Sequence, residues 1–505
     1  MKELSIYSKR SMSSNKGISD AMGGENGLKL MQWTCVILLL LTPYCITAIN
    51  NPLPLQEMQA LEELYTVTNG QYWFWEEEGT EKGIKWDFSI DESTGEYLYH
   101  PCSSDVNIRW QRIDCDSTRS SITKLGLVGF NLTGYLPNSL GNLVNVSNFI
   151  FEDNNLVGSI PDTIGQLQEI EILSLSFNGI TGSFPSSITR LTKLKQMWIT
   201  ECFLTGTIPP EFGSFPHIEW MHLADNYFTG TIPTTVGKLT TLYAITFDYT
   251  LMTGHIPSEI GLLHERMEYL GVSNSDFSGT IPVELSMLQT TYYFFLQSNL
   301  LTGTIPPELG ELHNVDFFGL SNNDLTGTIP IELAKLANMG DLYMDANFFS
   351  GTVPLGLFDN YNAMRVLRLQ RNLLTGDLSG RFRGSLTALK NIDFSDNRLS
   401  GNVPIDIFEL PDVQNVALSL NCFEGSLPDS ICYSRNLSVL SLDGLGAAEH
   451  CKNEVKVPLT GVTVFNTLGG SVPPCVWTLP TLQVLHVTGN GIEFIVKAAC
   501  ARLLV

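Results

Sequence analysis

Residues 314–330 read NVDFFGLSNNDLTGTIP and contain the unit from which most of the chain is built. The glycine of this stretch, Gly327, has counterparts spaced 24 or 25 residues apart. Thirteen such glycines occur: Gly134, Gly158, Gly182, Gly206, Gly230, Gly254, Gly279, Gly303, Gly327, Gly351, Gly376, Gly401 and Gly425. A repeat of that length with leucines at fixed offsets predicts a solenoid, in which each unit packs mainly on its neighbours.

The positions around this glycine explain the rest of the unit. The residues nine and seven places before it are apolar and have the period of a strand, so both side chains should point into the core. The asparagine four places before it recurs in most turns, where a buried amide can bond backbone groups of its own turn and the next. Cys202 and Thr250 stand there in two turns, and both are small enough to fit. Pro330, like its counterparts, fixes φ after the glycine turn.

The full pattern, LxxLxLxxNxLxGxIPxxLxxL, resembles the plant-type leucine-rich repeat over about residues 122–442. The resemblance implies an α/β fold, namely a right-handed solenoid with a concave parallel β-sheet and with the IP segments on its convex side. It also implies an N-terminal cap, here residues 49–121, in which a helix and a disulfide cover the open end of the core. The stretch NCFEGSLPDSIC, closer to the C-terminus, also resembles algal and diatom leucine-rich repeat proteins.

The cap has its own sequence signals. In PCSSDVNIRWQRIDCD, Cys102 and Cys115 flank Trp110, and the resemblance implies that the two cysteines are bonded. Their spacing is longer than is usual in the family, so an insertion lies between them. Residues 55–70, just before, predict the cap helix with one apolar face. That face consists of Leu55, Met58, Leu61 and Leu64.

A targeting segment precedes the cap. Residues 33–49, WTCVILLLLTPYCITAI, follow a basic leader, but their dense apolar core is shorter than the ~20 residues of a membrane span. This favours a signal peptide within residues 1–48, cut after Ala48, while an uncleaved signal anchor in residues 33–49 is the alternative. Either interpretation places the repeats outside the cell, secreted or at the plasma membrane, in an oxidising space that allows disulfides.

The repeat rhythm breaks after Gly425. The next recognisable glycine is Gly470, 45 residues further on, so residues 443–464 predict an island or a degenerate turn. Four cysteines surround this segment and allow three pairings. They are Cys422, Cys432, Cys451 and Cys475. Residues 465–505 hold final partial repeats, in which Phe494 stands where the next glycine is due. Because no closing cap is recognisable, we expect the natural protein to continue further.

The composition of the chain argues against several functions. Its formal net charge is −23, and such acidity disfavours nucleic acid, which rewards basic surfaces. No GxGxxG with kinase elements, no GxxxxGK[ST], no GxSxG and no HExxH occurs, and the eight histidines have no metal-ligand spacing. The sequence therefore predicts neither an enzyme nor a cofactor or metal site, and it favours a protein that works by binding.

The surface that such binding would use is the concave face of the sheet. Residues that point away from the core lie ten, eight, six and five places before each glycine, and in the fourth to tenth turns many of them are aromatic. Exposed Trp and Tyr are typical of recognition sites, although packing along the sheet is an alternative reason for them. The candidate ligand-binding residues are Trp198, Trp220, His222, Asp248, Tyr249, Tyr269, Tyr293, Phe295, Phe317, Tyr343, Asp345 and Arg368.

These residues predict a receptor-like protein without a kinase that holds a peptide, protein or glycan on its concave face, with a co-receptor as a further partner. A soluble inhibitor of a secreted hydrolase is the alternative, and the presence or absence of a membrane anchor distinguishes the two. Arg368 would either meet an anionic group of the ligand or pair with Asp345 and Asp393.

Two further features concern the rest of the surface. Three sequons, at Asn131, Asn145 and Asn436, predict N-glycosylation off the strand face. Threonine or serine recurs on both sides of the repeat glycine, as at Thr326 and Thr328. The resulting columns resemble the flat threonine arrays of ice-binding proteins. Because threonine is ordinary at these positions in the family consensus, ice binding is only a remote alternative.

Overall fold

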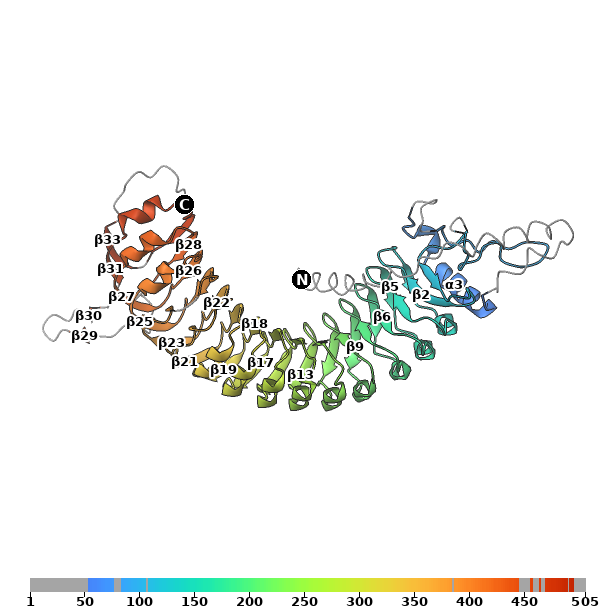
Figure 1. Ribbon diagram of the computed structural model, residues 1–505, viewed down its shortest axis with the longest axis horizontal. Helices are drawn as coiled ribbons and strands as arrows, with labels where there is room; N and C mark the ends of the chain where they lie inside the picture. Colours follow the sequence, from blue (N-terminus) through green and yellow to red (C-terminus); the bar gives the residue numbers. More distant parts are fainter. Residues whose placement is uncertain are drawn as a thin grey trace, which may run out of the picture. The chain divides into compact units, whose positions relative to one another are not determined.

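The computed structural model describes residues 53–76, 83–105, 108–383, 386–444, 455–456, 463–464, 468–488 and 490–494. The predicted targeting segment, residues 1–48, lies outside these described residues, as do the end of the chain, residues 495–505, and most of the island. The chain divides into two compact units, Met1–Pro52 and Leu53–Val505. The described part of the second unit is a stack of turns around one continuous apolar core (Figure 1).

Within this unit, the turns contribute one short strand each to a sheet that has sixteen strands among the described residues and lines the inner side of the stack (Figure 1). All neighbours pair in parallel except β1 with β2, which pair antiparallel. In spatial order the strands are β1 (Ile113–Cys115), β2 (Ile122–Gly126), β4 (Asn148–Ile150), β6 (Ile172–Ser174), β8 (Gln196–Trp198), β10 (Trp220–His222), β12 (Ala244–Thr246), β14 (Tyr269–Gly271), β16 (Tyr293–Phe295), β18 (Phe317–Gly319), β20 (Asp341–Tyr343), β22 (Val366–Arg368), β24 (Asn391–Asp393), β26 (Asn415–Ala417), β28 (Val439–Ser441) and β32 (Val484–His486).

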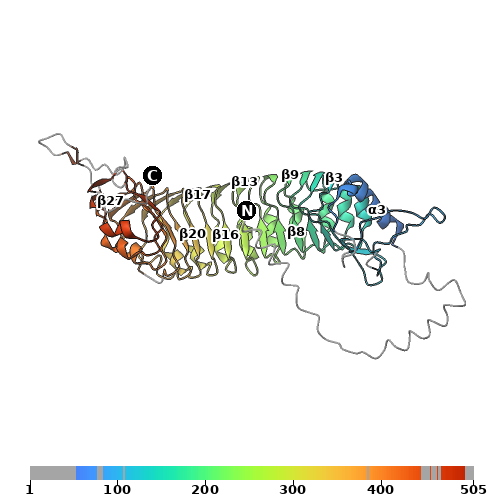
Figure 2. The same cartoon turned by 90° about the horizontal axis from the view of Figure 1, so that it is seen from above.

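A second parallel sheet, which the sequence analysis did not anticipate, runs along one edge of the first (Figure 2). It is formed by the LxG segments that follow the asparagine of each turn, and fifteen of its strands lie in the described residues. They are β3 (Thr133–Tyr135), β5 (Asn155–Gly158), β7 (Gly179–Gly182), β9 (Phe203–Thr207), β11 (Tyr227–Gly230), β13 (Leu251–His255), β15 (Asp276–Thr280), β17 (Leu300–Gly303), β19 (Asp324–Gly327), β21 (Phe348–Thr352), β23 (Leu373–Gly376), β25 (Arg398–Asn402), β27 (Cys422–Ser426), β31 (Leu468–Ser471) and β33 (Gly491–Phe494).

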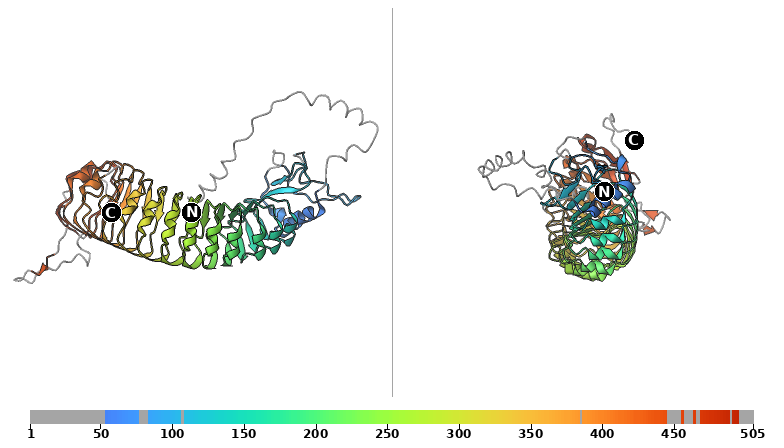
Figure 3. Two further views of the ribbon diagram at one scale, coloured as in Figure 1. Left: turned by 60° about the horizontal axis from the view of Figure 1, so that its bottom comes forward. Right: turned by 90° about the vertical axis from the view of Figure 1, so that its right-hand side faces the viewer.

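The outer side of most turns is a short 3₁₀-helix (Figure 3). Each begins directly after the proline of the IP segment, because that residue fixes φ and has no N–H to leave unpaired. These helices are η2 (Asn138–Asn142), η3 (Asp162–Gln166), η4 (Ser186–Arg190), η5 (Pro210–Ser214), η6 (Thr234–Lys238), η7 (Ser258–Leu263), η8 (Val283–Met287), η9 (Pro307–Glu311), η10 (Ile331–Lys335), η11 (Ile405–Glu409), η12 (Asp429–Tyr433) and η14 (Pro474–Thr478).

The repeat glycines make the sharp turn that the sequence predicts. All thirteen have φ between 75° and 82°, a region that side chains with a Cβ rarely enter. At Gly327 there is a second constraint, because a Cβ added there would lie 2.7 Å from Cγ2 of Thr304 in the preceding turn. Glycine is therefore required for the backbone conformation and for the close approach of neighbouring turns.

The recurring asparagines are buried and join each turn to the preceding one, rather than to the next as expected. Asn323, for example, donates from Nδ2 to the carbonyl oxygens of Leu296 (3.0 Å) and Leu320 (3.1 Å), and its Oδ1 accepts the N–H of Leu301 (3.1 Å). The substitutes keep part of this pattern. The Cys202 thiol donates to the Leu175 carbonyl at 3.4 Å, but it cannot reproduce the amide's acceptor.

The N-terminal cap consists of α3 (Leu55–Val67), η1 (Gly70–Tyr72) and the segment that reaches the first strands. Trp110 is fully buried, and Cys102 and Cys115 form a disulfide with their Cα atoms 5.7 Å apart. This confirms the disulfide-linked helical cap. The predicted apolar face of the helix is wrong at Leu55, which is 63% exposed. Leu55 starts the helix, and side chains lean toward the helix N-terminus, so its side chain extends beyond the core.

At the C-terminal end the stack continues across the inserted segment. Strand β28 pairs directly with β32, and β27 with β31, so the extra residues between them leave the stack. Within that segment β29 (Val455–Lys456) pairs antiparallel with β30 (Thr463–Val464). Cys432 is bonded to Cys475, and Cys422 is also in a disulfide, whereas Cys451 lies outside the described residues. Every helix of the described part is too short or too polar to span a bilayer.

Candidate functional site

The inner sheet carries a continuous row of rings, which we call the aromatic ladder. It comprises Trp198, Trp220, His222, Tyr269, Tyr293, Phe295, Phe317 and Tyr343. Ring centroids lie 4.0 Å apart for Trp198 and His222, and 4.8 Å apart for Phe317 and Tyr343. The widest step along the row is 6.4 Å, between His222 and Tyr269, where the small Thr246 stands on the intervening strand.

Strand register explains why the row is continuous. The first and last residues of each three-residue strand point away from the core, so each strand offers two positions in the concavity. Where the last position is glycine, the ring of the first position leans over it. A Cβ added to Gly319 would lie 2.9 Å from Cε1 of Phe317, and the same holds for Gly271 and Tyr269. This alternation places a single ring on β14 and on β18, whereas β10 and β16 carry two rings each and β12 carries none.

The structure corrects three of the predicted concave residues. His222 and Asp248 are 3% and 5% exposed, so they are buried among neighbouring side chains instead of open to solvent. Tyr249 is exposed, but it lies at the corner between the two sheets with a left-handed φ of 54°. Residues five places before the glycine adopt this conformation in turn after turn, and it directs their side chains off the sheet face.

The remaining candidates lie on the inner sheet or just beyond it. Arg368 does not form either expected ion pair among the described residues. Its guanidinium lies over the Tyr343 ring, with 4.8 Å from Cζ to the ring centroid, and so extends the aromatic ladder by one cation–π contact. Asp345 accepts a hydrogen bond from the Ser321 hydroxyl, and Asp393 accepts one from the backbone of Ser395.

Acidic residues gather at the His222 end of the ladder. Burial raises the pKa of Asp248 to about 6, an effect that the nearby Asp225 increases and hydrogen bonds from Ser273 oppose. Burial and the charge of Glu201 raise the pKa of Asp225 to about 6. Burial alone lowers the pKa of His222 to about 3, so its imidazole is neutral at physiological pH. The described residues contain no group of three or more His, Cys, Asp and Glu side chains placed to hold a metal ion.

Sequence reasoning missed several residues of this region. Tyr243 precedes β12, outside the positions considered, and stacks on Trp220 at 5.9 Å. Thr246 is 1% exposed, and its hydroxyl has no partner in the described structure. Asp225 and Glu201 stand at the same corner position as Tyr249. The only signal for them in the sequence is that acidic residues occupy this position in two neighbouring turns.

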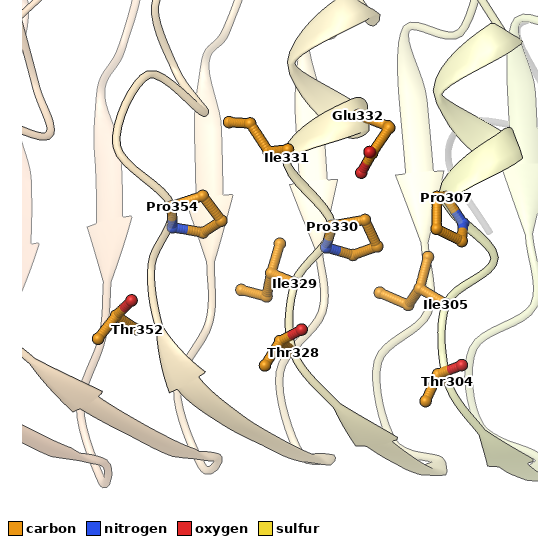
Figure 4. Close-up of a pocket in the computed structure, with 10 residues that line it drawn as sticks. All are labelled: Thr304, Ile305, Pro307, Thr328, Ile329, Pro330, Ile331, Glu332, Thr352 and Pro354. Carbon is orange, nitrogen blue, oxygen red and sulfur yellow. The ribbon is translucent and has the colours of Figure 1, made fainter.

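The threonine columns have a packing role. The Cγ2 methyl groups of Thr304 and Thr328 each lie over the glycine of the following turn, and Thr326 donates its hydroxyl to the Gly303 carbonyl at 3.2 Å. Between these turns is an open depression of about 560 Å³, in which Thr304, Thr328 and Thr352 form a row (Figure 4). A second depression has the same place in the repeat near Ser159 and Pro161. Both are products of the repeat geometry.

The three predicted sequons lie away from the inner sheet. Asn145 and Asn436 are exposed and hold the same position in their turns, where their amides donate to the Ser121 hydroxyl and the Pro411 carbonyl. Asn131 is half-buried at a corner of the first turn. Glycosylation at these sites stays a prediction.

Comparisons with known proteins identify the repeat. The family model described as Leucine Rich Repeat matches residues 169–191. The leucine-rich repeat ectodomain of the plant membrane receptor kinase GASSHO1/SCHENGEN3 from Arabidopsis thaliana superimposes with a TM-score of 0.61 and 28% identity, over 73% of this chain and 44% of that one. The chain is a plant-type leucine-rich repeat protein. No curated protein sequence matches it significantly.

Other leucine-rich repeat structures are similar to the same extent. The plant peptide hormone receptor RGFR1, solved in complex with RGF2, gives a TM-score of 0.62 and 28% identity over 73% of this chain and 59% of that one. A leucine-rich repeat protein of Leptospira interrogans gives 0.55 and 26%, over 73% and 91%. The chain thus spans about half the length of the two plant ectodomains. Because the similarity extends to a bacterial protein, it identifies the repeat and not the ligand.

Proposed function

We propose that this leucine-rich repeat protein binds an extended peptide, or an extended segment of a protein, along the aromatic ladder of its inner sheet. The observation that carries the proposal is the row of rings from Trp198 to Tyr343, most of them half-buried, in which successive ring centroids lie no more than 6.4 Å apart. Aromatic side chains at such positions supply large contact areas at a low cost in conformational entropy, which is why they dominate binding energy at interfaces.

The orientation of the rings favours a polypeptide over a glycan. Sugars bind aromatic residues through open ring faces. In the ladder, many ring planes face each other, with interplanar angles of 10° between Trp198 and His222 and 22° between Phe317 and Tyr343. The ring edges are then the accessible surface, and apolar side chains of a peptide can pack against them.

The compartment fits this role. The disulfides Cys102–Cys115 and Cys432–Cys475 form and persist in oxidising environments, so the proposal places the repeats outside the cytosol, secreted or at the cell surface. Two similar plant ectodomains were solved in complex with Casparian strip integrity factor 2 and RGF2, which supports a peptide or protein ligand in general. Signalling through a co-receptor would follow only if the natural protein is anchored in a membrane.

A library of 12-residue peptides displayed on phage, selected on the full chain, tests the proposal. We expect enriched sequences rich in apolar residues, and we expect Trp198→Ala and Tyr293→Ala to lower their affinity about tenfold or more. Tyr227→Ala is the matched control, since Tyr227 is an exposed aromatic residue on the edge sheet, stacked on Phe203 at 5.9 Å. Its affinity should equal that of the wild type.

Two results would overturn the proposal. If no peptide is enriched on the wild type over the Trp198→Ala and Tyr293→Ala variants, the ladder is not a peptide site. If enriched peptides bind those variants as well as the wild type, the site lies elsewhere. A glycan array and a panel of secreted hydrolases, probed with the same variants, then separate a glycan receptor and an inhibitor from the proposed function.

A further inference from the structure

The inner side of the stack is unusually acidic around the His222 end of the aromatic ladder. Between Lys195 and Arg266 the sequence contains seven acidic residues, of which Glu211 and Glu259 lie in the outer 3₁₀-helices, and a single lysine or arginine, Lys238. That lysine ends η6, on the outer side of its turn. Glu201, Asp225 and Asp248 come from three successive turns, and no ion pair found among the described residues includes any of them.

Elsewhere on the inner side, several acidic residues have cationic partners from the chain itself. Glu171 pairs with Lys195 at 2.9 Å, and Arg365 joins Asp316 and Asp341 at 3.0 and 2.8 Å. Neighbouring carboxylates without a cation between them repel one another, and burial further disfavours their charged form. Asp225 and Asp248 differ from these residues, because burial raises the pKa of both carboxyl groups to about 6 and no cation among the described residues bridges them.

A second observation points to the same place. His222 and Thr246 are register partners on adjacent strands, 3% and 1% exposed, and neither His222 Nε2 nor Thr246 Oγ1 has a hydrogen-bond partner in the described structure. Buried polar atoms without partners are rare and destabilising, so each requires an explanation. The pair lies at the widest step of the ladder, between His222 and Tyr269.

Asp248 links the unpaired atoms to the other acids, because it shares a sheet face with Thr246 and lies close enough to Asp225 for that charge to raise its pKa. Asp248 follows Thr246 by two residues, so both side chains are on the same face of the sheet. Asp248 Oδ1 accepts the Ser273 N–H at 2.6 Å, while Oδ2 lies over Gly271, 2.2 Å from where a Cβ would be. Asp225 follows His222 by three residues, and its N–H donates to the Asp248 carbonyl at 2.9 Å. We call Glu201, His222, Asp225, Thr246 and Asp248 the acidic cluster.

We infer that the acidic cluster holds a cationic nitrogen group of the ligand, namely a lysine or arginine side chain or the amino terminus of a peptide. Such a group offers a positive charge to Asp225 and Asp248. It also offers N–H donors to the neutral imidazole of His222 and to the Thr246 hydroxyl, which a purely apolar ligand would leave unpaired. The inference rests on the proposed function, since it names one feature of the ligand that the ladder binds.

The peptide selection described above tests this inference through a different readout. Most sequences enriched on the wild-type chain should share a lysine, an arginine or a required free amino terminus in fixed register with apolar residues. The double variant Asp225→Asn/Asp248→Asn removes two charges and keeps acceptors, and it should lower affinity for these peptides about tenfold or more. Asp276→Asn/Asp324→Asn is the matched control, because both aspartates are exposed on the edge sheet.

Peptide variants identify the source of the cation. One variant peptide has an acetylated amino terminus, and in the other glutamine replaces the basic residue. One of these changes, and not the other, should make the wild type and the double variant bind with equal affinity, and that change identifies the cation. If neither change matters, the inference is overturned. It is also overturned if the enriched peptides show no preference for a cation, or if the double variant binds them as well as the control does. Peptides that still require Trp198 and Tyr293 would then leave the proposed function intact.

Acidity provides an independent readout. Lowering the pH from about 7.5 to about 5.0 protonates Asp225 and Asp248, whose pKa values are both about 6. His222 stays neutral over this range. Affinity of the wild type for the selected peptides should therefore fall about tenfold, and the Asp225→Asn/Asp248→Asn variant should change little. An equal fall in both proteins would contradict the role of the cluster.

Discussion

The buried asparagines are the residues that join one turn to the next. The side-chain Nδ2 of each donates to carbonyl oxygens of its own and the preceding turn, and its Oδ1 accepts a backbone N–H of the preceding turn. One side chain thus provides hydrogen bonds that water would otherwise supply to several backbone groups. Thr250 shows what a smaller residue needs in the same place. Its hydroxyl reaches only the Phe247 carbonyl, and Ser275 of the following turn contacts it at 3.0 Å.

Replacing one of these asparagines should therefore be costly. Asn323→Ala leaves the buried Leu301 N–H without its acceptor and removes one of the two amide donors that the Leu296 and Leu320 carbonyls each have, and we expect a loss of about 3 kcal/mol in the free energy of unfolding. Asn338→Ala is the control, because this exposed amide donates once, to the His313 carbonyl, and its loss should cost under about 1 kcal/mol. Urea denaturation measures both, and equal losses would contradict the role of the buried amide.

Asp248 predicts a stability that depends on pH. Its pKa of about 6 in the folded chain exceeds the ordinary value of 3.8, so the folded state binds the proton more tightly than the unfolded state. The free energy of unfolding should then fall as the pH rises from about 4 to about 6. Asp248→Asn, which mimics the protonated acid, should stabilise the chain at pH 7.5 by on the order of 2 kcal/mol and have little effect at pH 4.

Thermal denaturation at the two pH values checks this expectation. The exposed Asp324→Asn variant serves as the reference for the loss of one negative charge, and its melting temperature should change little at either pH. A stabilisation by Asp248→Asn that is as large at pH 4 as at pH 7.5 would show that the ionised carboxylate is not the destabilising group. Replacing a charged residue that serves binding often stabilises the fold and weakens ligand binding, and we expect both effects from Asp248→Asn.

Among the elements, the short strands and 3₁₀-helices depend on their neighbours for stability. No strand of the inner sheet is longer than five residues, so none would persist outside the stack. The aromatic ladder belongs to this level, since each ring is positioned by the strand before it and the strand after it. The disulfide between Cys432 in η12 and Cys475 in η14 performs a similar task where the inserted segment separates consecutive turns.

Loss of that disulfide should loosen the last turns selectively. It closes a loop with a sequence separation of 43, for which chain entropy predicts a contribution of roughly 4 kcal/mol. In a Cys432→Ser/Cys475→Ser variant, hydrogen exchange should accelerate in β28, β31 and β32 and remain unchanged in β10 to β20. Uniform acceleration along the stack would contradict the picture of turns that contact only their neighbours.

For the molecule as a whole, the curved sheet sets the size of the ligand. From Trp198 on β8 to Arg368 on β22 there are seven inter-strand steps, or about 34 Å at ~4.8 Å each. An extended chain of about ten residues covers that length. A compact small molecule would contact only two or three turns and would leave most of the ladder without a partner.

The affinity of the selected peptides should therefore depend on their length. Successive truncation from 12 to 6 residues should weaken binding at each step below about ten residues, because each step removes contacts with one turn. Hydrogen exchange with the longest peptide should decrease across β8 to β22 and not in β2 to β6. A six-residue peptide that binds as tightly as the full one would contradict an extended mode of binding.

Prediction from the sequence succeeded where one residue acts through a rule that holds in every turn. The glycine turn, the asparagine column and the inward leucines repeat at fixed offsets, so the chain confirms each of them many times over. It failed where a side chain depends on residues about 24 positions away. His222 and Asp248 counted as exposed because their strand positions face the concavity, but side chains of neighbouring turns bury them, as Trp198 of the preceding turn does for His222.

The repeat itself, its sheet and its cap were determined by the sequence, because short-range geometry and a constant period leave one way to stack the turns. The tertiary structure alone decided what the concave surface is. It aligned rings from separate turns into one ladder, it brought Asp225 close to the buried Asp248, and it left two buried polar atoms, His222 Nε2 and Thr246 Oγ1, without partners. The reason is physical, since burial and electrostatic repulsion depend on distances between side chains, and the sequence does not contain those distances.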